Sequence, residues 1–402
     1  MKAPVANDVV ITGIGLVSSL GEGADANWKA LTNFAGPVLE RERFAPYTVH
    51  PLPEVDWSQQ IAKRDQRQME AWQRIGTYAA GLALEDAGIK DDEALCASMD
   101  MIVAAGGGER DTAVDTMILN RIADGVPDRE VLINEVLTTE LRPTLFLAQL
   151  SNLLAGNISI VHKVTGSSRT FMGEEGAGIS ALQTTIARIR SGQSTHALVG
   201  GAYNAEHPDM LLGYELGHHL HRDAWMPVWQ RDRCEGGGVI TGSGGVFLVL
   251  ESRARAERRG VPVYALLGNV AADQGPLDAT KTHHRLSQMA DEADIGSVDV
   301  IISAASGSHA RTSAERSFLS DNLTDIPFRG ISTATGHLRD AQFPLAVAVA
   351  ALALRHGSTP APFDPEIERP AERAPTSVGV IALGYNAGEG MVRVSRAEGD
   401  GS

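Results

Sequence analysis

The chain has 402 residues, 43% hydrophobic and 21% charged, so it can bury one large core or two fused cores without disulfides or bound metal. The formal net charge of −15 argues against general nucleic-acid binding, because neutralising a phosphate backbone requires an excess of clustered Lys and Arg. The two cysteines, Cys96 and Cys234, have no cysteine partner nearby and no histidine at ligand spacing. This pattern argues against a disulfide framework and a zinc site, and it predicts a reducing compartment.

The N-terminal sequence MKAPVANDVVITGIG lacks a cationic segment followed by a long apolar run, and no later stretch reaches the length of a membrane span. We therefore expect a soluble, cytoplasmic protein with no membrane span.

The first part of the chain alternates predicted strands and helices. The β-branched run at residues 8–15 closes with glycines and predicts a buried strand followed by a tight turn. Apolar residues at helical spacing over residues 64–87 predict one long helix that ends at Gly88. Further strands are predicted at residues 101–108, 196–201 and 245–251, and further helices at residues 177–190 and 252–259.

The same alternation starts again at residues 263–273. An apolar strand is predicted at residues 298–303, an almost wholly apolar helix at 343–354 and a final strand at 378–383. Two successive rounds of strands and helices predict a duplicated α/β architecture with buried sheets.

Five segments, in order along nearly the whole chain, resemble the synthase II branch of the condensing enzymes, the β-ketoacyl-acyl-carrier-protein synthases. These segments are VVITGIGLVSSLG, RDQRQMEAWQRIGTYAAGLALEDAGI, RPTLFLAQLSNLLAGNISIVHKVTGSSRT, GGGVITGSGGVFLVLESRARAERRG and VGVIALGYNAGEG. The resemblance implies a thiolase-like fold, in which two similar halves form a five-layered α/β/α/β/α sandwich, and it implies a dimer. We place the first half, with the nucleophile-position helix and the dimer interface, at residues 1–260. The second half, with the histidine loops and the terminal glycine loop, follows at 261–402.

Condensation requires a thiolate, which the dipole of a helix N-terminus stabilises. In the segment SSRTFMGEEGAGISAL, the resemblance places Glu175 at the position of the catalytic cysteine, with Glu174 as the alternative occupant. No cysteine, serine or threonine stands at the helix start after Thr170, so a shift of register does not restore a nucleophile.

The remaining catalytic positions also follow from the resemblance. The first active-site histidine of the family lies eleven residues before a glutamate, and counting back from Glu315 gives Ala304, with His309 further along the same loop. The second histidine corresponds to His337 in a Thr-Gly-His turn, and the lysine expected five residues earlier is Ser332. Three of four catalytic side chains are therefore expected to be replaced.

The family's oxyanion hole consists of backbone N–H groups, which here would belong to Glu175 and Tyr385. A carboxylate at position 175 could lie against this hole, since a helix N-terminus favours negative charge.

Other interpretations of these residues remain open. Glu175 could be an ordinary first-turn glutamate, and His337 a structural histidine that caps the next helix, which we favour over catalysis because its partner is absent. The histidines at 217–221 have spacing unsuited to a metal, and the glycine runs at 106–108 and 236–238 lack a nucleotide-binding pattern. We expect no metal and no cofactor.

A small cationic group, Lys63, Arg64 and Arg67, stands at the start of a helix that in relatives helps dock the acidic acyl carrier protein. It is a candidate docking site within an acidic chain, although most such groups are merely solvated.

The leading hypothesis is a chain-length-factor-like subunit, meaning an acyltransferase-family homologue that does not condense alone. It would pair with a cysteine-containing ketosynthase as a heterodimer, or with itself, in fatty-acid synthesis, including very long chains, or polyketide synthesis. The alternatives are a malonyl-carrier-protein decarboxylase and a carrier-protein-binding scaffold without catalysis.

Overall fold

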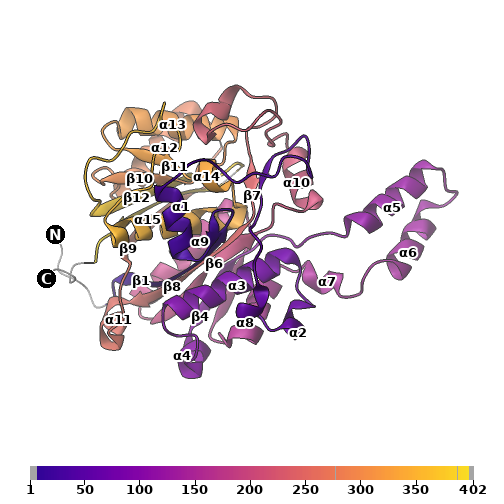
Figure 1. Cartoon of the computed structure of the whole chain (residues 1–402), viewed down its shortest axis with the longest axis horizontal. Coiled ribbons are helices and arrows are strands. Elements are labelled where there is room, and N and C mark those ends of the chain that lie inside the picture. Colours follow the sequence, from indigo (N-terminus) through magenta and orange to yellow (C-terminus); the bar gives the residue numbers. More distant parts are fainter. Residues whose placement is uncertain (1–6, 277, 387, 398–402) are drawn as a thin grey trace.

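The computed structural model describes residues 7–276, 278–386 and 388–397 (Figure 1). Its main sheet is built from two sets of strands that follow one another in the chain. The first set is β1 (Val9–Ser18), β4 (Asp100–Ala104), β5 (Ser168–Phe171), β6 (His196–Tyr203) and β8 (Gly244–Ser252). The second set is β9 (Ala265–Asp273), β10 (Val300–Ser303), β11 (Phe328–Gly330), β12 (Ser377–Leu383) and β13 (Glu389–Ser395).

The two sets have the same topology. Their spatial orders are β5-β4-β6-β8-β1 and β11-β10-β12-β13-β9, so each runs third, second, fourth, fifth, first in chain order. In both, the first two pairings are parallel and the last two antiparallel. The sets join where β1 pairs with β9. The predicted duplicated α/β architecture is confirmed. The division at residues 260 and 261 stays a prediction, which the repeated strand order supports.

Helices make the other layers of the sandwich (Figure 1). Between the two sets of strands lie α9 (Glu175–Arg190) and α15 (Gln342–His356), and α15 is buried over its whole length up to Leu354. The outer face of the first set is covered by α3 (Ala71–Asp86) and α8 (Leu153–His162), and that of the second by α12 (Ala279–Glu292) and α13 (His309–Asn322). This is the expected five-layered arrangement, with the apolar core on both sides of each sheet.

The remaining elements are short or peripheral. The helices are α1 (Ala24–Thr32), α2 (Lys63–Gln66), α4 (Glu93–Ser98), α5 (Thr112–Ala123), α6 (Arg129–Thr139), α7 (Leu145–Ala148), α10 (Pro208–Glu215), α11 (Arg253–Arg259) and α14 (Ser332–Thr335). The 3-10 helices are η1 (Trp57–Gln59), η2 (Val228–Arg233) and η3 (Arg339–Ala341), and the short strands are β2 (Gly21–Glu22), β3 (Val49–His50) and β7 (Thr241–Gly242). Figure 1 shows α5 and α6 as a hairpin that projects from the body of the molecule.

Two sequence predictions need correction. The predicted helix over residues 64–87 is two helices, α2 and α3, because Glu70 starts α3 with a capping box whose Gln73 side chain accepts the Glu70 N–H. The first strand does not turn at its glycines but continues to Ser18. Gly13 and Gly15 instead let β1 approach the backbone of α3, where a side chain would not fit.

None of the helices in the described residues combines the length and apolar character needed to cross a bilayer.

The close approach of β1 to α3 makes a testable prediction. In Gly15→Ala, the new methyl group would overlap the carbonyl oxygen of Ala79, so the free energy of unfolding should fall by about 1–3 kcal/mol or more. In Gly213→Ala, at an exposed position of α10, the methyl group meets no neighbouring atom and the free energy should instead rise by roughly 0.5–1 kcal/mol. Urea unfolding of both variants measures these changes, and effects of the same sign would contradict the packing argument.

Candidate active site

The start of α9 directs a carboxylate into the protein interior. Glu175 is the first residue of the helix and only 1% exposed. The preceding residue, Glu174, has φ 59° and ψ −133°, a conformation that L-residues rarely adopt. Such backbone strain persists only where surrounding contacts hold it, and it is concentrated at functional sites. The position predicted for a nucleophile is therefore a strained turn at a helix N-terminus.

Both polar neighbours of Glu175 contact the same carboxylate oxygen. Its Oε1 accepts a hydrogen bond of 2.8 Å from the backbone N–H of Tyr385, in the loop after β12. The Nε2 atom of fully buried His337 also lies 2.8 Å from Oε1, within ion-pair range but off the direction of a good hydrogen bond. The other oxygen, Oε2, has no hydrogen-bond partner among the residues that the structure describes. The Tyr385 N–H, one of the two predicted oxyanion-hole donors, is thus engaged by the protein's own carboxylate.

The orientation of His337 is fixed from behind by Tyr214, whose hydroxyl lies 3.1 Å from Nδ1. Burial raises the pKa of Tyr214 well above its ordinary value, so the phenol stays protonated. Its O–H group can then donate a hydrogen bond to Nδ1. Sequence reasoning missed Tyr214, because α10 carries no motif that connects it with His337.

A second carboxylate ties down the Tyr385 side chain. The Tyr385 hydroxyl donates to Glu174 Oε1, and Nη2 of Arg339 lies 3.6 Å from the same oxygen. Burial, together with the hydrogen bond to Glu174, raises the pKa of Tyr385, which therefore stays a neutral donor. The aromatic ring also contacts Tyr214, with a centroid separation of 4.6 Å, and His219, at 4.9 Å. Glu174 therefore binds the Tyr385 hydroxyl and Glu175 binds the Tyr385 backbone N–H, so both glutamates fix the position of this residue.

The other two predicted catalytic positions carry neutral residues. Ala304 directly follows β10, is buried, and donates its N–H to Ile381. Ser332 begins α14, donates to the Ala305 carbonyl at 2.6 Å and accepts from Gln342 Nε2 at 2.9 Å. Neither position offers a side chain that titrates. His309 opens α13 with its ring near Gly238, and within the described residues its ring contacts and hydrogen bonds do not reach Glu175 or His337.

Asp340 is a further acidic group of the site that the sequence did not reveal. It follows Arg339 in η3 and is 1% exposed, and its Oδ1 has no partner. Burial raises the pKa of Asp340 to about 7, the Arg339 charge opposes this shift, and Glu175 and Glu174 add to it. The site therefore concentrates three carboxyl groups beside one guanidinium and one imidazole.

The cysteines and the predicted docking residues lie apart from these contacts. Cys96 is buried with its thiol 3.5 Å from the Ile89 carbonyl, and the Cys234 thiol lies 3.2 Å from the sulfur of Met226. Lys63 and Arg64 on α2, and Arg67 just after it, are exposed, and Arg64 makes a 3.5 Å ion pair with Asp65. The carrier-protein docking role stays a prediction.

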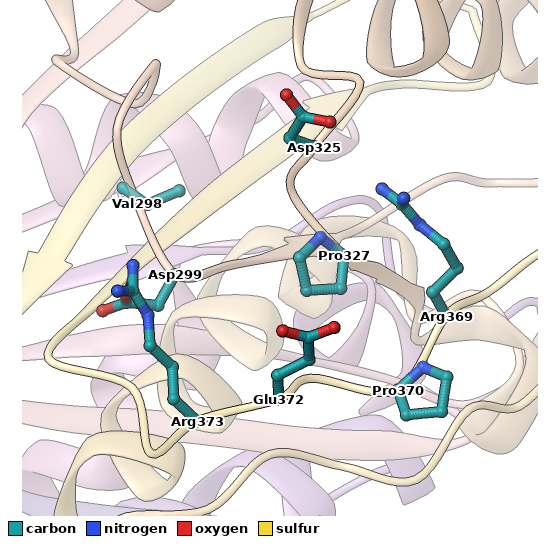
Figure 2. Close-up of a pocket in the computed structure, with 8 residues that line it drawn as sticks. All are labelled: Val298, Asp299, Asp325, Pro327, Arg369, Pro370, Glu372 and Arg373. Carbon is teal, nitrogen blue, oxygen red and sulfur yellow. Dashed lines mark ion pairs between the residues drawn. The ribbon is translucent and has the colours of Figure 1, made fainter.

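A cavity of about 570 Å³ lies beside Val298 and Asp299 (Figure 2), which directly precede β10 in the chain. It is lined by Val298, Asp299, Asp325, Pro327, Arg369, Pro370, Glu372 and Arg373. Arg373 is 78% exposed and pairs with Asp299 at 2.6 Å. The cavity lies at residues that come before β10, whereas Ala304 of the predicted site comes after β10. We therefore do not assign the cavity to the active site.

No group of three or more His, Cys, Asp or Glu side chains that could hold a metal is found within the described residues, and the histidines at 217–221 form a turn and loop.

The duplicated sandwich, with a buried polar cluster at the start of α9, defines a protein of the thiolase-like fold. The model of the family described as "Beta-ketoacyl synthase, N-terminal domain" matches residues 6–256, and the chain belongs to this family. The expected resemblance and fold class are thereby confirmed.

Similar proteins include a synthase, a ketoacyl synthase beta subunit and a ketosynthase/chain length factor. The chain is 26% identical over 267 residues to 3-oxoacyl-[acyl-carrier-protein] synthase 2 of Vibrio cholerae, a match that covers 64% of this chain and 61% of that enzyme. It is 27% identical over 380 residues to the tetracenomycin polyketide synthase ketoacyl synthase beta subunit of Streptomyces glaucescens, covering 88% and 87%. The solved structure of the ishigamide ketosynthase/chain length factor has a TM-score of 0.78 at 20% identity, covering 98% of this chain and 100% of that one.

The buried Asp340 predicts a pH dependence of stability. Its folded pKa, about 7, lies above the ordinary 3.8, so the folded state binds this proton more tightly than the unfolded state. Its contribution to the free energy of unfolding should therefore be fully present below about pH 4, decline as pH rises towards 7, and then level off. Asp340→Asn should remove this decline, as measured by urea unfolding between pH 4 and pH 8.

The matched control is Asp321→Asn, an exposed residue at the end of α13, which should follow the wild-type pH profile. A decline of unchanged steepness in Asp340→Asn would show that this carboxyl does not titrate as described.

Proposed function

We propose that the chain is a non-condensing, chain-length-factor-like subunit of a β-ketoacyl synthase pair, in fatty-acid or polyketide synthesis. The observation that carries the proposal is the hydrogen bond between the Tyr385 N–H and Glu175 Oε1. An oxyanion hole works by offering unengaged donors to the charge that develops in the reaction. Here one of the two predicted donors already binds a carboxylate.

The other contacts of the site support the absence of condensation. A covalent acyl intermediate needs an activated nucleophile, and a carboxylate with both its contacts fixed at Tyr385 and His337 does not replace a thiolate. The predicted positions of the first histidine and the lysine hold Ala304 and Ser332, which transfer no proton. Groups that act as one catalytic unit lose most of their activity when a single member is removed.

Decarboxylation of malonyl-carrier protein is the second candidate, because His337 is retained beside a predicted oxyanion-hole donor. Two features disfavour it. An ionised Glu175 would repel the malonyl carboxylate, and stabilising the enolate would rest on one imidazole, since Ala304 stands in the place of the other. A scaffold without any role for the pocket is the third candidate, and it predicts that substitutions at Glu175 leave every product unchanged.

Exposed apolar side chains support pairing with a second chain. Leu119 on α5, Val131 on α6 and Phe146 on α7 are each more than 60% exposed, as is Met172 just after β5. β5 is the last strand on its side of the sheet, and one of its edges pairs with no strand in the part of the chain that the structure describes. Apolar surface and a free strand edge on one molecule are typical of an interface.

We propose a cysteine-containing ketosynthase as the partner, because a dimer of two copies of this chain would have no thiolate at either predicted nucleophile position. The names of two similar proteins, a ketoacyl synthase beta subunit and a ketosynthase/chain length factor, support this choice. Acyl carrier protein would dock at Lys63, Arg64 and Arg67, and we place the pair in the cytoplasm. The test is coexpression with a cysteine-containing homologue from the same genome, followed by analysis of complex mass and product length.

Phe146→Asp should weaken this pairing at least tenfold, because it places a charge in the proposed apolar interface. Size-exclusion chromatography with mass detection of the coexpressed proteins measures the complex. Val38→Asp, at an exposed valine outside α5 to α7, is the control and should leave the complex intact. If the synthase elongates to the same product length with and without this chain, the chain-length role is wrong.

Glu175→Cys should not restore condensation. The thiol would regain a helix N-terminus, but Ala304 and Ser332 still lack the proton-transferring side chains of a condensing site, so turnover of acyl- and malonyl-carrier protein should stay at background. The assay is product formation by the purified variant alone, with the wild-type chain as control. Turnover within tenfold of a cysteine-containing homologue would contradict our assignment of the lost positions.

A further inference from the structure

A buried arginine lies outside the site described above and has no acidic partner. Arg231, in η2, is 0% exposed. Its Nε donates to the Met226 carbonyl at 2.8 Å and its Nη1 to the Gly238 carbonyl at 3.3 Å, while Nη2 has no partner. Among residues 7–276, 278–386 and 388–397, no carboxylate lies within ion-pair distance of this guanidinium. Burial lowers the pKa of Arg231 to about 9, which leaves it charged at pH 7.

The guanidinium lies against the start of α13, a helix of 14 residues. A Cβ atom on Gly307, two residues before the helix, would be 3.2 Å from Arg231 Nη1. The N-cap residue Ser308 makes no side-chain capping bond, so no side chain there satisfies the first N–H groups of the helix. A helix N-terminus carries partial positive charge. The guanidinium therefore lies beside a helix N-terminus that also carries partial positive charge, an arrangement that costs free energy without a negative charge nearby.

Two histidines lie near Arg231. Among the described residues, the buried His309 Nε2 has no hydrogen-bond partner, and it lies 3.1 Å from where a Cβ on Gly238 would be. The ring of fully buried His50 interacts with the Ala334 backbone. Burial and the charge of Arg231 lower the pKa of His50 to about 3, so it stays neutral and adds no charge. Arg231 is therefore the charged side chain of this group, and among the described residues its Nη2 and His309 Nε2 have no hydrogen-bond partner.

We propose that a small monovalent anion binds between Arg231 and the N-terminus of α13. Arg231 Nη2 and the uncapped N–H groups of the first helical turn would donate to it, as they do in anion sites at helix termini. A single negative charge matches the single unpaired guanidinium. A halide ion and a small carboxylate such as acetate share this chemistry. The site is independent of the proposed partner subunit and of Glu175.

The test is a titration of the intact protein with sodium bromide and, separately, with sodium acetate. Ionic strength is held constant with sodium gluconate, whose anion is too bulky for a buried site. The midpoint of thermal unfolding should rise along a saturating curve with bromide or acetate, and the ion that saturates at lower concentration identifies the ligand class. Arg231→Met should lower the apparent affinity at least tenfold. Arg233→Met removes an exposed arginine from the same η2 and should behave as wild type.

Crystals of the wild-type protein soaked in bromide give a second readout that does not depend on a variant's folding. We expect an anomalous peak within hydrogen-bond distance of Arg231 Nη2. Absence of that peak, together with acetate and bromide curves that match gluconate, would overturn the proposal. An Arg231→Met titration identical to wild type would overturn it as well.

Discussion

The contact between Glu175 and the Tyr385 backbone joins the two halves of the duplicated fold at their polar centre. Glu175 starts the helix that lies between the sheets, and Tyr385 belongs to the last loop of the second half. The surrounding contacts depend on where this carboxylate lies. His337 approaches its oxygen, Tyr214 supports His337 from behind, and Glu174 holds the Tyr385 hydroxyl. At the position that we predict for the nucleophile, Glu175 thus completes an internal network.

Elsewhere in the second half, buried acidic groups are either paired with arginines or protonated. Glu389, at the start of β13, is fully buried and paired with Arg285 of α12 at 2.6 Å and with Arg311 of α13 at 3.0 Å. Burial raises the pKa of Glu315 to about 8, so its carboxyl is largely protonated at pH 7 and accepts the Leu383 N–H. Such paired or neutral groups avoid the free-energy cost of burying a charge without a partner.

The fold was predictable because strand and helix periodicity recur in both halves and because five family motifs appear in order. The start of α9 at Glu175 followed from the same motifs. The break before α3 was not predictable from apolar spacing, since it depends on a cap at Glu70. The projecting hairpin of α5 and α6 buries few of its own residues, so it gives no clear periodic signal.

The contacts around the predicted site could not be predicted from the sequence. Tyr214 meets His337 across 123 residues of chain, and Asp340 becomes significant only through burial among other acids. Arg231 stands among charged neighbours in the sequence, and nothing in that pattern predicts a buried side chain. Packing between distant segments determines these properties, and local sequence does not encode them.

The attachment of Glu175 to the chain has a consequence for any molecule that approaches the same backbone donor. Because the fold holds this carboxylate next to the N–H group that it binds, its effective concentration there is far above that of any dissolved ligand. A free acyl group would have to compete with this tethered anion for the Tyr385 N–H. The protein thus carries its own competitive ligand for the Tyr385 N–H. The fraction of molecules in which Glu175 occupies this donor does not depend on the concentration of the protein.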